Sequence, residues 1–283
     1  MENAEKREAR LEKEKAAAIK QGENELGVRS KTGLTGGEAI KLKKYRAKGK
    51  TLSGDVMMAA VENAIATNEV NAAMGVICAT PTAGSSGTLP GALFMLEQRL
   101  GLSEDQMIRF LFTAGGLGLI IANHAGIAGA TGGCQEEVGS ASAMAAAAAV
   151  EAAGGSPEQS SQALAIALSN LLGLVCDPIA GLVEIPCVKR NAIGAGNALI
   201  AADMALAGCT SMIPAEESRC HRTLRVAHHW IAVEVIGHPA AKHLEEAEIL
   251  WCEHISQCAS CHELFARTSP LHVLVDLDAR IVR

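Results

Sequence analysis

The stretch SASAMAAAAAVEAAGG, residues 140–155, decides the fold expected for this chain. A serine opens it, a run of alanines follows and two glycines close it, which is the pattern of a capped helix. Alanine has the highest helix propensity, and its small side chain lets neighbouring helices pack closely. The stretch therefore predicts a helix that begins near Ser140, ends at Gly154 and lies among other helices.

The composition of the whole chain favours an all-α domain. Of its 283 residues, 49% are apolar and only 2% are aromatic, and 28 are glycine. Ser103 and Ser156 are each followed three residues later by glutamine, which is the pattern of a capping box at a helix start. Further helices are expected after residue 53 and over 191–206, whereas 75–93 is expected to be a loop. No run of alternating residues predicts strands.

Charge and cysteine usage exclude several classes of protein. The net charge is −6 and the basic residues form no single patch, so nucleic acid is not an expected partner. The chain starts with a charged run and not a secretory signal, so its nine cysteines are expected to be reduced in a cytoplasm. The longest apolar stretch, Phe110–Gly133, is rich in glycine and interrupted by Asn123 and His124. It predicts a buried core segment and not a membrane span.

Composition divides the chain into three parts. Residues 1–25 are expected to form a charged helical arm, exposed or frayed, and residues 26–217 form the main domain. Residues 218–283 contain eight of the nine histidines and both tryptophans. This tail is either a small separate domain or a non-native ending produced by a shifted reading frame. Its Cys252, His254, Cys258, Cys261 and His262 loosely resemble a zinc site.

Three cysteines in small-residue surroundings are candidate metal ligands. Cys134 follows two glycines, and Cys176 and Cys187 bracket a loop that contains proline and glycine. Three thiolates are one short of a closed tetrahedral site, which leaves a position free for substrate. The spacing alone is equally compatible with three small buried residues, because free cysteine is often buried.

Two polar, glycine-rich segments are candidate anion sites. Residues 79–92 contain Thr80, Thr82, Gly84, Ser85 and Ser86, whose hydroxyls and N–H groups suit a carboxylate or phosphate. A turn of Ser30, Lys31, Thr32 and Gly33 offers the same groups. A plain surface loop explains either segment as well, and a core histidine with satisfied hydrogen bonds explains His124.

The chain resembles the iron–sulfur L-serine dehydratases, specifically the separate α subunit of the bacterial two-subunit enzymes. The resemblance covers roughly Leu26 to Glu217 and ends where the atypical tail begins. It rests on long motifs: SKTGLTGGEAIKL, LSGDVMMAAVENAIATNEVNAAMG, ICATPTAGSSGTLPG, IRFLFTAGGLG, GGCQEEVGSASAMAAAA, LGLVCDPIAGLVEIPCVKRNA and NALIAADMALAG.

The resemblance implies an all-helical catalytic domain in which Cys134, Cys176 and Cys187 hold a [4Fe–4S] cluster. It implies conversion of L-serine to pyruvate and ammonia without pyridoxal phosphate. The substrate carboxylate is expected at the Thr80–Gly87 loop or the Ser30–Gly33 turn, and Lys31 and His124 are weak candidates for the base. A separate β subunit is implied, and with it a hetero-oligomer. The alternatives are a zinc-stabilised interaction protein that uses the C-terminal Cys/His cluster and an inactive remnant of the dehydratase fold.

Overall fold

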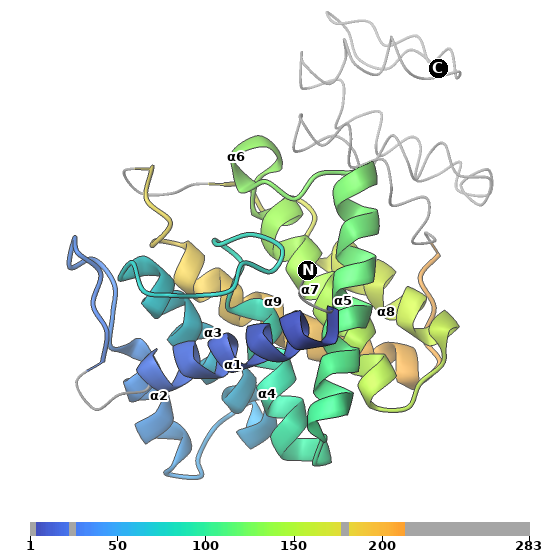
Figure 1. The fold of residues 1–283 in the computed structure, drawn as a ribbon, viewed down its shortest axis with the longest axis horizontal. Coiled ribbons are helices and arrows are strands. Elements are labelled where there is room, and N and C mark those ends of the chain that lie inside the picture. The colour runs from blue at the N-terminus through green and yellow to red at the C-terminus, as the bar shows by residue number, and fades with distance from the viewer. Residues whose placement is uncertain (1–3, 23–26, 177–180, 213–283) are drawn as a thin grey trace, which may run out of the picture. The chain divides into compact units, whose positions relative to one another are not determined.

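The computed structural model describes residues 4–22, 27–176 and 181–212, and these residues form an all-helical fold (Figure 1). The expected fold class is confirmed, since the only β pairing within these ranges is an isolated bridge between Arg29 and Gly36. The chain divides into two units, Met1–Arg222 and Thr223–Arg283, and every described residue belongs to the first. The helices are α1 (Ala4–Gly22), α2 (Glu38–Arg46), α3 (Gly54–Ala72), α4 (Thr88–Leu100), α5 (Glu104–His124), α6 (Gly129–Gly132), α7 (Cys134–Ala152), α8 (Pro157–Asn170) and α9 (Cys187–Leu206).

Helix α7 forms the centre of the core and packs against α4, α5, α8 and α9. Its residues from Val138 to Val150 are all buried, and most of them are alanine. Glycines of the partner helices bring the backbones closer still. A Cβ atom at Gly118 of α5 would lie 2.6 Å from Met144 Cε, and one at Gly194 of α9 would lie 2.7 Å from Val138 Cγ1. Small residues at the crossings therefore set the distances between these helices.

Both expected capping boxes are present. The hydroxyl of Ser103 accepts a hydrogen bond from the backbone N–H of Gln106, whose side chain accepts one from the N–H of Ser103. Ser156 and Gln159 make the same pair of bonds at the start of α8. These starts are predictable because all the partners lie within four consecutive residues.

Two other helices begin earlier than expected. Helix α7 begins at Cys134 and not near Ser140, and α9 begins at Cys187 and not at 191. Helix α4 was not expected at all, and it begins at Thr88, inside the stretch expected to be a loop. At the start of α7 the N–H of Gln135 donates to the carbonyl of Leu174 at 2.8 Å. A distant residue thus takes the place of a local cap, and no local sequence pattern reveals such a partner.

Helix α1 is less exposed than an arm would be. The expected helix is present, but it packs along α3 and α5. Its Lys15, Ala18 and Ile19 are buried in that contact. The expectation of an exposed or frayed helix is therefore wrong for this face of α1, because the apolar residues near its end reach the core.

Helix α5 is more exposed than the expected core segment. By length and composition it is the one helix of the described residues that could cross a membrane, and 33% of that window is buried. Asn123 near its end is exposed, so it is not the buried polar residue expected. The side chain of His124 lies outside the described residues. The exposed large apolar residues of this helix are Phe112, Leu119 and Ile120.

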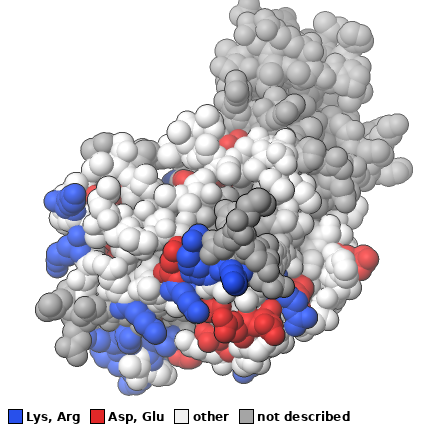
Figure 2. All heavy atoms as spheres, in the orientation of Figure 1, with Lys and Arg blue, Asp and Glu red and all other residues white. Residues whose placement is uncertain are grey.

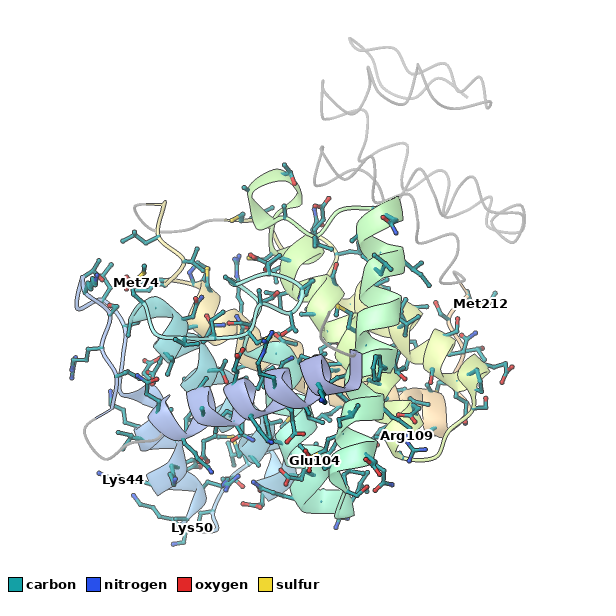
Figure 3. The ribbon with its side chains drawn as sticks, in the orientation of Figure 1. Lys44, Lys50, Met74, Glu104, Arg109 and Met212 are labelled. Atoms are coloured by element: carbon teal, nitrogen blue, oxygen red, sulfur yellow. The ribbon has the colours of Figure 1, made fainter. Side chains whose placement is uncertain are left out.

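Charged side chains of both signs lie next to one another on the face drawn in Figure 2. Ion pairs in the described part of the chain include Arg46 with Glu62 at 3.2 Å and Lys189 with Glu38 at 3.2 Å. Basic side chains also gather at the lower left of this face, where Figure 3 places Lys44 and Lys50, so the expected absence of a basic patch is not borne out there. The absence of a nucleic-acid partner stays a prediction.

A residue with a left-handed backbone conformation ends α3 and changes the direction of the chain. Met74 has φ +63°, and its side chain is 74% exposed and projects from the surface (Figure 3). Gly75 follows where a Cβ atom would lie 2.5 Å from Val70 Cγ1. This turn sends the chain into the segment 76–87, which returns to the core before α4.

Asn191 joins the start of α9 to the end of that segment. Its side-chain amide donates to the carbonyls of Gly84 at 2.7 Å and Cys187 at 2.9 Å. Its Oδ1 accepts from the N–H groups of Gly87 and Thr88, each at 3.0 Å. Asn191 is fully buried, so these bonds replace all its contact with water. The start of α4 is thereby fixed against the first turn of α9.

Replacing Asn191 with alanine should destabilise the fold by about 2–4 kcal/mol, because several buried backbone groups would lose their partner at once. The measurement is urea unfolding of the full chain, followed by far-UV circular dichroism. Asn170→Ala is the matched control, since Asn170 is exposed and its amide donates to Asn197. The control should change the unfolding free energy by less than about 0.5 kcal/mol. Equal losses in the two variants would contradict the role given to Asn191.

Candidate metal centre

The three candidate cysteines lie in neighbouring segments. Cys134 is the first residue of α7 and Cys187 the first of α9, and both are buried. Cys176 is exposed and directly precedes residues 177–180, which are not described. A Cβ atom at Gly133 would lie 3.1 Å from the backbone nitrogen of Cys176, so the chain at Cys176 passes close to the start of α7.

Arg190 connects two of these segments. From the first turn of α9 its guanidinium donates to Cys134 Sγ at 3.1 Å and to the carbonyl of Val175. The loop before Cys176 is held again by Gln135, whose Oε1 accepts from the N–H of Gly173 at 2.8 Å. The segments that carry the three cysteines are therefore fixed to one another by hydrogen bonds.

Burial raises the pKa of the two inner cysteines. It raises the pKa of Cys134, although the hydrogen bond and charge of Arg190 act in the opposite direction. Burial, followed by the negative charges of the nearby Cys134, Glu137 and Cys176, raises the pKa of Cys187 to about 11. A thiolate at Cys176 would thus disfavour ionisation of both Cys134 and Cys187. A cationic group bound among them would reverse this effect, as metals do at thiolate ligands.

The donor set is a set of thiols, which bind zinc and iron–sulfur clusters. Among the described residues, no three His, Cys, Asp or Glu side chains are close enough together to hold a single metal ion. A zinc ion requires its ligands within about 2.0–2.3 Å of one point. The described arrangement therefore does not fit a mononuclear ion, whereas a cluster, in which each thiolate binds a different iron, places its ligands farther apart.

The glycine-rich loop contacts the start of α7 through Glu137. Thr82 donates a hydrogen bond from its hydroxyl to Glu137 Oε1, and Ser85 Oγ lies 3.0 Å from Thr82 Oγ1. Ser86 is fully buried, and its hydroxyl has no hydrogen-bond partner in the described part of the chain. The Thr80 N–H donates to the Thr82 carbonyl at 3.2 Å and shapes the same turn. Thr82, and Ser85 through it, are thus brought beside Glu137 in the first turn of α7.

The Ser30–Gly33 turn lies beside the segment that leads to Cys187. Thr32 donates from its hydroxyl to both oxygens of Glu184, at 3.0 and 2.8 Å. Ser30 is buried and its Oγ lies 3.0 Å from Thr32 Oγ1, while the Gly33 N–H donates to the Ser30 carbonyl. Lys31 is exposed on the same turn.

Helices α4, α7 and α9 all begin at this end of the core. Asn191 joins the starts of α4 and α9, and Arg190 joins those of α7 and α9. The N-terminus of a helix carries a partial positive charge of about +0.5, so three such ends favour bound anions. Thiolates or a substrate carboxylate would be stabilised here.

Four polar residues of this site are missing from the sequence-based candidates: Glu137, Glu184, Arg190 and Asn191. Glu137 lies three residues after Cys134, and Arg190 lies three residues after Cys187. On a helix such pairs share one face. If the starts of α7 and α9 had been predicted correctly, Glu137 and Arg190 would have been expected beside Cys134 and Cys187. The candidates in the C-terminal Cys/His cluster all lie outside the described residues.

Comparison with known proteins finds several proteins similar to this chain. Three relatives are named as α chains of L-serine dehydratase, two of them as probable. The one from Bacillus subtilis (strain 168) is 66% identical over 201 residues, which are 71% of this chain and 66% of the relative. The one from Latilactobacillus sakei is 71% identical over 163 residues, 58% of this chain and 78% of the relative. The one from Peptoniphilus asaccharolyticus is 49% identical over 181 residues, 64% of this chain and 62% of the relative.

The match to the first and third of these relatives spans just under two thirds of their own length. A family model covers more of the present chain. It is described as the serine dehydratase alpha chain and matches residues 1–226, which include every residue of the site. With the cysteines and the loops around them inside the matched region, the chain belongs to the serine dehydratase alpha chain family.

Proposed function

We propose that this chain is the α subunit of an iron–sulfur L-serine dehydratase, a lyase that converts L-serine to pyruvate and ammonia. The observation that carries the proposal is the meeting of Cys134, Cys176 and Cys187 at the end of the core where three helices begin. Family membership supports the substrate, because the relatives are named for L-serine. The proposed cofactor is a [4Fe–4S] cluster, and pyridoxal phosphate is not required.

The three thiols would hold the cluster. With three cysteine ligands one iron keeps a free position, and the bound cluster would supply a Lewis acid for the serine hydroxyl. The protein supplies the surroundings: Arg190 orients Cys134 through its hydrogen bond, and the helix starts stabilise negative charge. Burial of Cys134 and Cys187 limits contact of their sulfur atoms with water.

The Thr80–Ser86 loop is the better of the two candidate sites for the substrate carboxylate. Ser86 has a buried hydroxyl without a partner in the described chain, and such a group gains most from a new hydrogen bond. In the Ser30–Gly33 turn, by contrast, the Thr32 hydroxyl already donates to Glu184. Lys31 at that turn remains available to attract an anion from solvent.

The proposed enzyme includes a second chain. The relatives are named as α chains, which implies a β subunit and a hetero-oligomer. We place this complex in the cytoplasm, where thiols stay reduced. The tail from residue 218 on lies outside the described residues, so its role and the frameshift hypothesis stay predictions.

Anaerobic incubation of the chain with iron and sulfide should produce a broad absorbance band near ~400 nm from a cluster bound by thiolates. Cys134→Ser and Cys187→Ser should each lose most of this band. Cys209→Ser is the matched control, since Cys209 is exposed beyond the end of α9 and should leave the band unchanged. Bound zinc without the band would support the zinc-protein alternative instead.

The loaded chain, combined with its β subunit, should form pyruvate from L-serine. The assay measures pyruvate with and without the β subunit, and before and after exposure to air. Loss of activity in air, restored by iron and a reductant, is expected because an iron with a free position reacts with oxygen. A complete cluster without any pyruvate, even with the partner, would favour the inactive remnant.

Alkylation of the cluster-free chain at pH 8 should spare Cys187. Only the thiolate reacts, and a pKa of about 11 leaves about 0.1% of Cys187 ionised at this pH. Because the pKa is raised, reactivity should appear only as the pH approaches that value. Cys176 and Cys209 are exposed and should react first, as measured by mass spectrometry of the peptides. After cluster loading Cys176 should be protected and Cys209 should not; equal reactivity of Cys176 before and after loading would contradict its role as a ligand.

A further inference from the structure

Glu137 occupies the position where the cysteines and the proposed substrate loop meet. It lies in the first turn of α7, three residues after Cys134, so both side chains leave the same face of the helix. Its negative charge acts on both Cys134 and Cys187. The carboxylate is therefore close to both inner ligands of the proposed cluster.

The surroundings of Glu137 hold its carboxylate in place. Thr82 donates a hydrogen bond to Oε1, and Ser85 Oγ lies 3.0 Å from the Thr82 hydroxyl. A Cβ atom at Gly84 would lie 2.5 Å from the same Oε1, and one at Gly129 would collide with Oε2. Two glycines from different segments thus leave the space that the carboxylate fills. Glu137 is nevertheless only half-buried, so a ligand in the site can approach it.

The fully buried carboxylates of the described chain have other contacts. Glu62 pairs with Arg46, Glu69 accepts hydrogen bonds from the first N–H groups of α2, and Glu184 accepts them from Thr32 and Thr35. Glu136, the neighbour of Glu137, lies against Gly126 and Gly132. The carboxylate that accepts a hydrogen bond from Thr82 of the substrate loop is that of Glu137.

We infer that Glu137 is the base that removes the α-proton of the substrate, an inference that rests on the dehydratase function proposed above. The carboxylate takes the proton from Cα, and the electron pair of the C–H bond forms the Cα=Cβ double bond. The Cβ–O bond breaks, and the hydroxide takes up a proton from solvent and leaves as water, while Glu137 later returns its proton to solvent. The product is 2-aminoacrylate, whose imine form reacts with water to give pyruvate and ammonia. Thr82 is a positioning residue that orients the carboxylate.

The test uses the complex of this chain with its β subunit, loaded anaerobically, in the variants Glu137→Gln and Glu137→Asp. The Gln variant should keep the cluster absorbance and bind radiolabelled L-serine as the wild type does. Its rate of pyruvate formation should fall by about 10²–10⁴-fold, the usual contribution of a general base. The Asp variant should keep part of the rate, with a larger isotope effect for L-[2-²H]serine, because removal of the α-proton limits the rate more strongly.

Two matched variants separate catalysis from structure. Glu151→Gln makes the same change near the other end of α7 and should leave the rate and the isotope effect unchanged. Thr82→Val should lower the rate about tenfold and raise the isotope effect, and Thr82→Ser should restore both. A value near tenfold corresponds to about 1.4 kcal/mol of lost transition-state stabilisation.

The outcomes that overturn the inference are distinct from failure of the proposed function. A Glu137→Gln rate above one tenth of the wild type would show that the carboxylate is not the base. A fall in rate that only follows lost cluster absorbance or lost serine binding would assign Glu137 to assembly or binding instead. If the wild-type complex holds a cluster but forms no pyruvate, the proposed function itself fails, and this inference with it.

Discussion

The buried carboxamide of Asn191 is the interaction on which the rest of the site depends. It is bonded on both sides, to the carbonyls of Gly84 and Cys187 and to the N–H groups at the start of α4. A buried amide left partly unpaired is costly, so the two segments it joins cannot separate without loss of several hydrogen bonds. One side chain thus fixes the distance between the proposed substrate loop and a proposed cluster ligand. Contacts of Glu137 with the same loop extend this arrangement to Cys134.

Glycine residues also make this arrangement possible, because they leave space both in the core and around the site. In the core, Gly118 and Gly194 let α5 and α9 approach Met144 and Val138 of α7. Around the site, Gly84 and Gly129 leave the volume taken by the carboxylate of Glu137. The same residue type therefore serves packing in one place and a reactive group in the other. This dual use agrees with the abundance of glycine in the chain, 28 of 283 residues.

The sequence predicted what depends on neighbouring residues and missed what depends on distant ones. The all-helical class and the capping boxes at Ser103 and Ser156 are confirmed because their signals are local. The start of α7 was missed because Gln135 finds its partner at Leu174, a contact made only in the folded chain. The same error kept Glu137 out of the candidates. Only a helix that begins at Cys134 places the side chains of Cys134 and Glu137 on the same face. The partial exposure of α5 was missed because an apolar run does not show which of its faces has a neighbour.

The charges around the three cysteines determine how the proposed cluster can bind. Two charged groups act on the described cysteines Cys134 and Cys187, the guanidinium of Arg190 and the carboxylate of Glu137. Their opposite charges offset each other. Three thiolates would then remain with only the partial charges of the helix starts to balance them. Burial raises the pKa of Cys134 and Cys187 and so opposes this accumulation of negative charge. A cluster bound by these thiols must therefore displace their protons, so loading of the proposed centre releases protons.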